Sequence, residues 1–268
     1  MVKSIIRLLI FPVLALSILL GSCSYDSLNN KDKEKIEDYS KQILEQACIS
    51  ISLMAEKVEN QCCDIVLSKP VQERTEYTDD YDMLMNSRQI SDLLVSKFMN
   101  NKDIEMVFVE FNDGGIDSYR STDYVDYEDV KEFVKPEKNG SVNWVPVKIK
   151  ERNFVVLSKK ITSITTANDI GEIYIVLKDS YFQASIKNIP YGNDSRVFIL
   201  DSDGKIISTT KTDSDSETDC KGLTEKIQNY RMNSGVFTTE INKAENLVVY
   251  SKIKGRDWYV VGMIPAVN

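Results

Sequence analysis

The 268-residue sequence contains no histidine, and this absence excludes several kinds of site. Without an imidazole there is no Ser-His-Asp or Cys-His catalytic pair and no histidine-ligated zinc or haem. A phosphoacceptor histidine is absent too, so the chain by itself is not a histidine kinase. Glycine and proline are sparse, at 11 and 6 residues, which argues against a collagenous or linker-dominated chain. The length suits one large globular domain or two small ones.

Basic residues are in deficit, because 33 lysines and arginines stand against 41 aspartates and glutamates and give a net charge of −8. A nucleic-acid-binding surface needs a basic face that displaces counterions from phosphates, so we expect no nucleic-acid partner. The sequence also lacks a glycine-rich phosphate loop and a Gly-x-Ser-x-Gly nucleophile motif. We therefore predict that the chain is not an enzyme, has no catalytic residue and uses no cofactor.

The N-terminus carries the pattern of an export signal. Lys3 and Arg7 precede an uncharged apolar run over residues 8–20, and small residues follow up to Cys23. The run is shorter than the ~20 residues that cross a bilayer. Leu20-Gly21-Ser22-Cys23 resembles the lipobox of bacterial lipoproteins, which implies removal of residues 1–22 and lipid modification of Cys23. An uncleaved signal anchor is the alternative. Either way, we expect the remaining chain on the extracytoplasmic face of the cell membrane, held there by its N-terminus.

Neither the remaining cysteines nor the acidic clusters match a metal site. Cys48, Cys62, Cys63 and Cys220 allow three disulfide pairings, and free, partly buried thiols are the interpretation that we favour. Asp201-Ser202-Asp203-Gly204 resembles the start of a calcium loop, but the twelfth position, where an EF-hand needs a glutamate, is Thr212. We interpret this turn as a β-hairpin and residues 213–219 as a solvated loop, and we predict no metal ligand.

Two helices are expected in the first hundred residues. Residues 31–67 lack glycine and proline and place apolar side chains at near-helical spacing, which predicts one long amphipathic helix ending before Pro70. A second helix is predicted over residues 80–99. Its expected buried side consists of Tyr81, Leu84, Met85, Ile90, Leu93, Leu94 and Phe98.

After residue 99 the hydrophobic period changes to two, which indicates strands. In the first strand-rich module, a strand over residues 104–111 enters a hairpin at Asn112-Asp113-Gly114-Gly115. Further strands are expected at 142–148, 154–164 and 172–177, with a short helix near 127–134. A helix is expected at 178–188.

A second, smaller module repeats this order. Its elements are a hairpin of 196–200 with 205–208, a helix at 222–230, and strands at 235–240, 247–253 and 258–264. The repeated order predicts an α+β fold of one long N-terminal helix and two related PAS-like antiparallel sheets. The predicted boundaries are 1–22 for the signal, 23–78 for the stalk and long helix, and 79–177 and 178–268 for the two modules.

These features together resemble a known family. The long helix, the two sheets, the segment Val197-Phe198-Ile199-Leu200-Asp201-Ser202-Asp203-Gly204-Lys205-Ile206-Ile207-Ser208 and the closing strands through Pro265 are similar to double-Cache extracellular sensor domains of Gram-positive sensor histidine kinases and chemoreceptors. The resemblance implies a small-molecule ligand in the membrane-distal module, at about residues 79–177. In such receptors a second membrane helix and an output domain follow, whereas this sequence stops at Asn268. We therefore expect its signal to pass through a separate partner, a sensor kinase or chemoreceptor.

The resemblance also suggests ligand-binding residues. Amino-acid-binding members hold the ligand carboxylate with an arginine and aromatic residues, because a guanidinium can bond a carboxylate in bidentate fashion. The matching region offers Tyr119, Arg120, Tyr124 and Trp144. Their spacing departs from the family's motif, and the strand over 171–177 holds no aspartate for an ammonium group, so an amino acid, an organic acid and a sugar all stay open.

Each of these assignments has a structural alternative. Arg120 can instead be a solvated charge among Asp117, Asp123 and Asp126, and Trp144 can belong to the core. Trp258 is expected in the core of the second module. The function expected is that of an extracytoplasmic, membrane-anchored sensor-like protein that binds a small polar ligand. The alternative is a ligand-free structural or interaction protein, or a truncated receptor fragment, that pairs with a sensor kinase.

Overall fold

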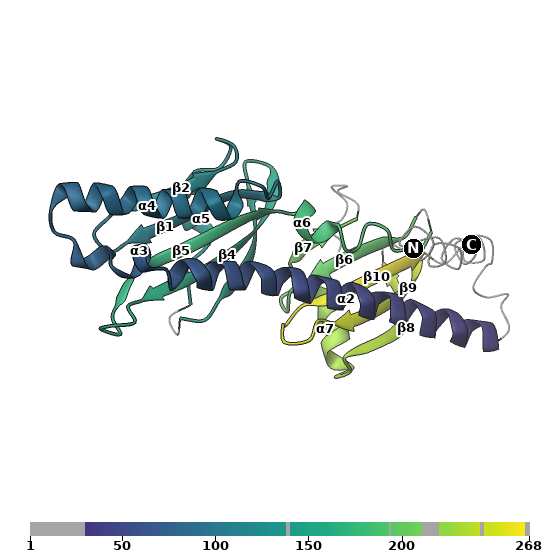
Figure 1. The fold of residues 1–268 in the computed structure, drawn as a ribbon. Helices are drawn as coiled ribbons and strands as arrows, with labels where there is room; N and C mark the ends of the chain where they lie inside the picture. The colour runs from purple at the N-terminus through teal and green to yellow at the C-terminus, as the bar shows by residue number, and fades with distance from the viewer. Residues whose placement is uncertain (1–29, 138–139, 193, 211–219, 242–243, 266–268) are drawn as a thin grey trace, which may run out of the picture. The chain divides into compact units, whose positions relative to one another are not determined.

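The computed structural model describes residues 30–137, 140–192, 194–210, 220–241 and 244–265. The predicted signal segment, Cys23 and the acidic loop 213–219 lie outside these residues. The fold is α+β, as predicted: a long N-terminal helix, α2 (Asn30–Val66), precedes two antiparallel five-stranded sheets (Figure 1). Within the described residues, no helix combines the length and the apolar character needed to cross a bilayer.

The contacts within the chain define two compact units, each built on one sheet. The first-sheet unit is Leu53–Tyr181, and the second-sheet unit combines the described residues of Met1–Ser52 with those of Phe182–Asn268. Helix α2 is therefore shared between the two units. The predicted boundaries after residues 78 and 177 stay predictions.

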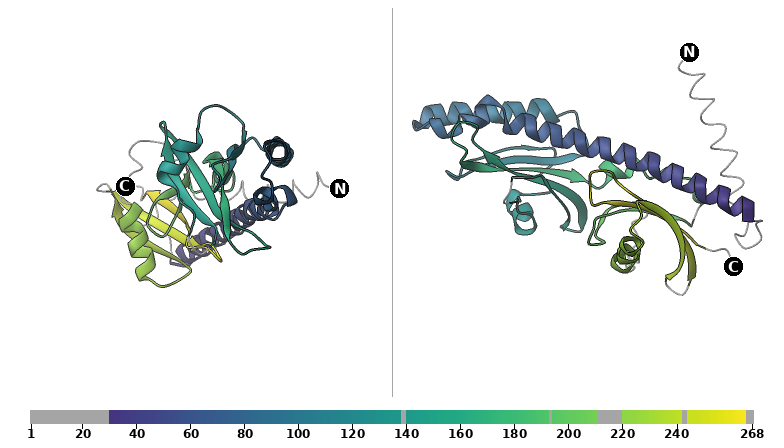
Figure 2. Two further views of the ribbon diagram at one scale, coloured as in Figure 1. Left: turned by 90° about the vertical axis from the view of Figure 1, so that its left-hand side faces the viewer. Right: turned by 90° about the horizontal axis from the view of Figure 1, so that it is seen from below.

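The first sheet has the strand order β2-β1-β5-β4-β3. Its strands are β1 (Ile104–Phe111), β2 (Ile116–Arg120), β3 (Asn143–Ile149), β4 (Arg152–Thr162) and β5 (Asp169–Lys178). The helices of this unit are α3 (Lys69–Gln72), the 3-10 turn η2 (Arg74–Glu76), α4 (Asp80–Phe98) and α5 (Tyr127–Phe133). Figure 2 (right) shows α2 and α4 on one face of this sheet and α5 on the other. We call these the α4 face and the α5 face.

Strand β1 has the bounds that its alternating sequence predicts, and it is buried along nearly its whole length because it lies inside the sheet between β2 and β5. Helix α4 begins after Asp79, whose side chain accepts a hydrogen bond from the backbone N–H of Tyr81 at 2.8 Å. The short segments α3 and η2 between α2 and α4 were not predicted, since Pro70 indicated only where α2 ends.

The predicted buried side of α4 is only partly correct. Ile90, Leu94 and Phe98 are fully buried, but Tyr81 and Leu84 are each 67% exposed and Met85 is 38% exposed. The side chain of Asn86, which is polar, takes a buried position instead and donates to the Pro70 carbonyl at 2.8 Å. Helix α4 thus carries apolar residues on two opposite sides, and only one of them packs on the sheet.

The second sheet repeats the order of the first, as β7-β6-β10-β9-β8. Its strands are β6 (Arg196–Leu200), β7 (Ile206–Thr209), β8 (Ser234–Ile241), β9 (Ala244–Lys252) and β10 (Tyr259–Pro265), and its helix is α7 (Cys220–Asn229). The turn between β6 and β7 is the predicted hairpin, in which the Asp201 side chain accepts from the N–H groups of Asp203 and Lys205 at 2.9 and 2.8 Å. Trp258 is buried as predicted and meets the Phe182 ring edge-on at 5.6 Å.

The first half of α2 packs on the second sheet through Tyr191. The Tyr191 hydroxyl donates to the Ser40 carbonyl at 2.8 Å. Its ring lies against Gly262 of β10, where an added Cβ would come within 2.4 Å of the ring, so only glycine leaves room for this contact.

The predicted helix over 178–188 is wrong in length, because the structure has only the four-residue α6 (Ser180–Gln183) there. Turn hydrogen bonds follow, including those from the N–H of Ser185 to Phe182 and from that of Ile186 to Gln183. Phe182 and Ile186 are fully buried, so tertiary packing fixes this segment without a continued helix.

Candidate ligand site

The predicted ligand residues do not form one cluster, because they lie on opposite faces of the first sheet. Side chains alternate along a strand, so the neighbours Tyr119 and Arg120 of β2 point to different faces. Arg120 pairs in register with Met106 of β1, which belongs to the core under α5. Tyr124 packs on that same core. The α5 face therefore holds Arg120 and Tyr124.

Tyr119 and Trp144 lie on the α4 face. The Tyr119 ring stacks at 6.5 Å on Phe98 of α4. The indole N–H of Trp144, in β3, donates to Glu59 Oε1 of α2 at 2.7 Å. The structure thus gives both aromatic residues helix-packing contacts and separates them from Arg120.

The floor of the α5 face is apolar and tightly packed. Met106, Val156 and Val176 surround a stacked pair, Phe108 and Tyr174, whose ring centroids are 4.5 Å apart. The Tyr174 hydroxyl donates to Glu172 Oε2 at 2.7 Å, and burial together with this carboxylate raises the pKa of Tyr174. Such a floor favours a ligand with an apolar portion.

One polar group in this floor has no partner. Ser158 of β4 is fully buried, and its hydroxyl forms no hydrogen bond with any described residue. In register it lies between Asn143 of β3 and Tyr174 of β5, on the α5 face. A buried hydroxyl without a partner costs roughly 1–3 kcal/mol, and a hydrogen bond from a polar ligand group or a water molecule would remove this cost. Sequence reasoning missed Ser158, since a serine inside an apolar strand gives no sign of which face it occupies.

Three ion pairs at the rim of the α5 face connect helix α5 and Asp126, the residue before it, to neighbouring elements. Arg120 Nη1 lies 2.5 Å from Asp126, and Lys131 Nζ lies 2.5 Å from Glu110. Lys150 Nζ lies 2.8 Å from Asp129; this hydrogen bond lowers the pKa of Asp129 and raises that of Lys150. The structural alternative for Arg120, a solvated charge, is met only in part, because its side chain is 29% exposed and is paired with Asp126.

Tyr124 closes one side of this rim. Its hydroxyl donates to the Lys150 carbonyl, and the Arg152 guanidinium lies 4.0 Å above its ring. The ring itself packs against Phe154 at 6.3 Å. Tyr124 thus links the segment before α5 to the β3–β4 turn.

The α4 face holds a buried polar cluster that sequence reasoning also missed. Asp117, expected among solvated charges near Arg120, is only 4% exposed and accepts a hydrogen bond from the Ser87 hydroxyl. Its second carboxylate oxygen has no partner among the described residues, and burial raises the pKa of this carboxyl group. Arg74, only 6% exposed, donates to Asp113 at 3.1 Å and to the Met83 carbonyl at 3.3 Å. These contacts tie α4 to the β1–β2 hairpin.

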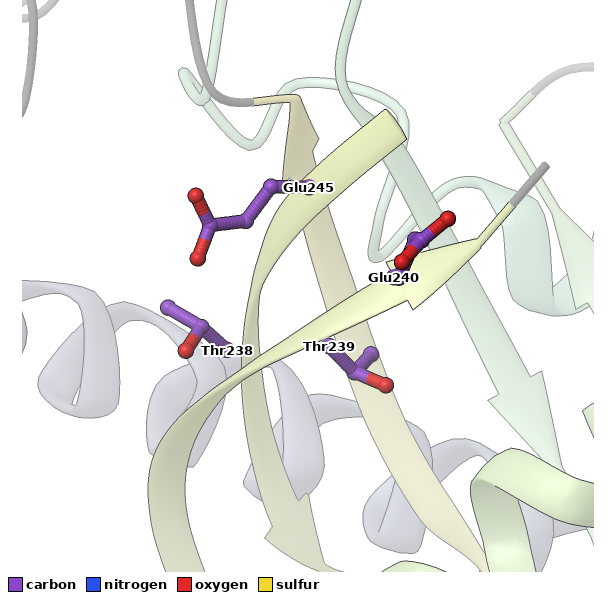
Figure 3. Close-up of a pocket in the computed structure, with 4 residues that line it drawn as sticks. All are labelled: Thr238, Thr239, Glu240 and Glu245. Carbon is purple, nitrogen blue, oxygen red and sulfur yellow. The ribbon is translucent and has the colours of Figure 1, made fainter. Parts of the chain in front are cut away.

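The second-sheet unit has an open hollow of about 500 Å³ at the β8–β9 hairpin (Figure 3). It is lined by Thr238, Thr239, Glu240 and Glu245. Two exposed carboxylates and two threonines give it little to hold a ligand with. Among the described residues, no three aspartate, glutamate, cysteine or histidine side chains come together as a metal site requires.

The four described cysteines are free thiols. Burial raises the pKa of Cys48 to about 11 and that of Cys62 to about 12. Neither thiol is therefore a nucleophile near neutral pH.

The Cache domain family model dCache_1 matches residues 29–268, and the chain belongs to this family. No curated protein sequence matches this chain. Solved structures share the fold at low identity. The ligand-binding domain of the Campylobacter jejuni chemoreceptor Tlp3, in complex with L-norvaline, is 12% identical, with a TM-score of 0.60 and coverage of 89% of this chain and 96% of that one.

Two further structures show the same likeness. The ligand-binding domain of the Pseudomonas aeruginosa PAO1 amino acid chemoreceptor PctB, in complex with L-Arg, is 16% identical, with a TM-score of 0.61 and coverage of 86% and 88%. The extracellular domain of the putative histidine kinase rpHK1S-Z16 is 14% identical, with a TM-score of 0.62 and coverage of 88% and 95%. The family and the shared fold support a sensory, ligand-binding role.

Proposed function

We propose that the chain is an extracytoplasmic, membrane-anchored sensor protein that binds a small polar ligand on the α5 face of the first sheet. The observation that carries this proposal is the fully buried, unpartnered hydroxyl of Ser158 in an otherwise apolar floor. A ligand group that bonds this hydroxyl removes its desolvation penalty, so the site is matched to a molecule with both apolar and polar parts.

The rim favours an anionic group on the ligand. Arg120 bonds Asp126 through one nitrogen, and a guanidinium has five N–H donors, so a ligand carboxylate can share or replace this contact. This supports an amino acid or an organic acid over a sugar. The amino-acid ligands named for the Tlp3 and PctB domains agree with that choice.

Asp126 supplies a route from binding to a conformational change. It pairs with Arg120, and it also precedes α5, where its N–H donates to Asp129 at 3.2 Å. A ligand that competes for Arg120 releases the start of α5 and shifts the population toward a second arrangement of the rim. A separate partner at the membrane, a sensor kinase or chemoreceptor, then detects this arrangement.

A thermal-shift screen of the full chain tests ligand binding. The compounds are single amino acids, organic acids and sugars, because a ligand at ~100 times its dissociation constant stabilises the folded state by ~2.7 kcal/mol. A hit among the acids that is lost in Arg120→Ala supports the proposal. No hit in any class would favour the ligand-free interaction protein instead.

Membrane attachment needs its own test, because Cys23 lies outside the described residues. A clickable fatty-acid analogue is fed to cells that express the wild type or Cys23→Ser. The lipoprotein proposal expects label on the wild type only. Unlabelled wild-type protein that still sediments with membranes would indicate the uncleaved anchor.

A further inference from the structure

Helix α7 covers one face of the second sheet, and a group of aromatic side chains lies where this helix ends (Figure 2, right). We call this group the tyrosine cluster; it consists of Tyr230, Phe237, Tyr250 and Tyr259. The Phe237 ring centroid is 5.3 Å from that of Tyr230 and 6.1 Å from that of Tyr250. Tyr250 and Tyr259 belong to the core under α7 and are 1% and 7% exposed, whereas Tyr230 is 53% exposed. The cluster therefore extends from the core to the surface.

The three tyrosine hydroxyls of the cluster form no hydrogen bond with any described residue. Buried tyrosine hydroxyls usually have a partner, so this group is unusual. Burial raises the pKa of Tyr250, and the nearby side chains of Tyr230 and Tyr259 raise it further. Three O–H groups without partners thus gather in a mostly apolar region, where each can donate to an acceptor.

Gly235 of β8 lets the polar end of Tyr250 reach the edge of the sheet. Strand β8 is an edge strand, and Gly235 pairs in register with Tyr250 of β9. A Cβ on Gly235 would lie 2.8 Å from the Tyr250 hydroxyl oxygen, so only glycine leaves room for the phenol to lie over β8. The Tyr250 hydroxyl therefore lies at the edge strand that also carries Phe237.

Two lysines lie beside the tyrosine cluster. Lys252 Nζ is 5.8 Å from the centre of the Tyr259 ring and 2.9 Å from Asp257, whose side chain is 78% exposed. Lys226 of α7 donates to the Thr239 hydroxyl of β8 at 2.7 Å, and no described carboxylate pairs with it. The ammonium group near the Tyr259 ring repels a second cation and attracts an anion. Because an exposed ion pair contributes little to stability, a ligand carboxylate can replace Asp257.

We propose that the tyrosine cluster is a second small-molecule site and that its ligand is an aromatic carboxylate. The ligand ring packs against Phe237 and Tyr230. Its carboxylate accepts hydrogen bonds from the hydroxyls of Tyr250 and Tyr259 and pairs with Lys252. A quaternary ammonium ion, which aromatic rings also attract, would meet the like charge of Lys252. The proposal does not depend on the ligand site of the first sheet, because every residue of the cluster belongs to the second-sheet unit.

Titration calorimetry of the full chain in mild detergent with phenylacetate tests this site. Acetate lacks the ring, and phenethylammonium carries a cation in place of the carboxylate; we expect both to bind at least about tenfold more weakly. Tyr250→Phe keeps the ring and removes one donor, so the dissociation constant for phenylacetate is expected to rise about tenfold or more. Lys252→Met, which leaves the buried tyrosines in place, is expected to weaken binding in the same way.

Tyr191→Phe is the matched control within the same unit. Its hydroxyl donates to the Ser40 carbonyl on the opposite face of the second sheet, so its loss is expected to lower stability and leave phenylacetate affinity unchanged. Arg120→Ala, in the first-sheet unit, is expected to bind phenylacetate like the wild type. The proposal is wrong if phenylacetate does not bind the wild type, if Tyr250→Phe and Lys252→Met bind it with unchanged affinity, if acetate or phenethylammonium binds as tightly, or if Arg120→Ala abolishes binding.

Discussion

Tyr119 and Arg120 are neighbours in β2, yet Tyr119 stacks on Phe98 of α4 whereas Arg120 pairs with Asp126 at the start of α5. One step along β2 therefore leads from Tyr119, which packs on α4, to Arg120, which belongs to the candidate ligand site on the opposite face. This separation makes the roles of the predicted residues individually testable.

Arg120→Ala is expected to weaken binding of an anionic ligand by about tenfold or more, because a charge-assisted contact is worth roughly 1.5–3 kcal/mol. Isothermal titration with a hit from the thermal-shift screen measures this. Lys148→Ala is the control, since Lys148 lies on the other face of the sheet and is 60% exposed. Equal affinities of the wild type and Arg120→Ala would remove Arg120 from the site.

Trp144→Phe is expected to lower stability and to leave ligand affinity unchanged. The substitution removes the 2.7 Å hydrogen bond to Glu59, which is worth roughly 1.5–3 kcal/mol of unfolding free energy because the acceptor is a carboxylate. Urea unfolding of Trp144→Phe, Glu59→Ala, which has no side-chain acceptor, and the double variant measures the coupling. Additive effects would contradict the bond, and a loss of ligand affinity in Trp144→Phe would return Trp144 to the site.

Much of the fold can be predicted from the sequence, but the side of α4 that packs on the sheet cannot. The apolar periods of α2 and β1 were long enough to locate both elements, and the matching order of elements predicted two related sheets. On α4, however, apolar residues recur on two sides, with Tyr81 and Met85 opposite Leu94. The sequence pattern does not say which side packs on a sheet, because that depends on contacts with distant strands.

The same dependence on distant contacts explains why the sequence did not point to Ser158 and Asp117. The charge of Arg120 made it a predicted site residue from the sequence, and it stays a prediction, whereas Ser158 and Asp117 owe their properties to burial, which the strand register decides. Asp117 is an acidic residue in an acidic region of the sequence, so its sequence context predicted a solvated side chain. Its 4% exposure results from α4 covering the β1–β2 hairpin.

Ser158→Ala is expected to raise the free energy of unfolding by up to about 1 kcal/mol without ligand, because it removes a buried hydroxyl that has no partner. The same substitution is expected to weaken ligand binding. Ser163→Ala is the matched control, because the buried Ser163 hydroxyl accepts from the N–H groups of Thr165 and Thr166 at 3.2 Å, so its loss destabilises the fold. A Ser158→Ala protein that is less stable and binds normally would contradict the site.

Asp117 is expected to make stability fall as pH rises. Burial raises the pKa of Asp117 above that of an unfolded aspartate, so the folded chain binds this proton more readily than the unfolded chain does. The free energy of unfolding therefore decreases as pH rises through the window between the unfolded and folded pKa values. Asp117→Asn, which cannot ionise, lacks this decrease, whereas Asp123→Asn at an exposed position keeps it. Melting temperatures measured across that window compare the three proteins, and parallel curves for the wild type and Asp117→Asn would refute the assignment.

The buried thiols are expected to resist alkylation in the folded state. Burial raises the pKa of Cys62 to about 12 and that of Cys48 to about 11, so at pH 8 almost no thiolate forms at either residue, and the side chains are also shielded from reagent. Cys63, which is partly exposed, is the internal control and is expected to react first with iodoacetamide. Peptide mass spectrometry before and after addition of urea measures the order of labelling. Rapid labelling of Cys62 without urea would show that the end of α2 opens in the native state, and would contradict the packing of this helix on the first sheet.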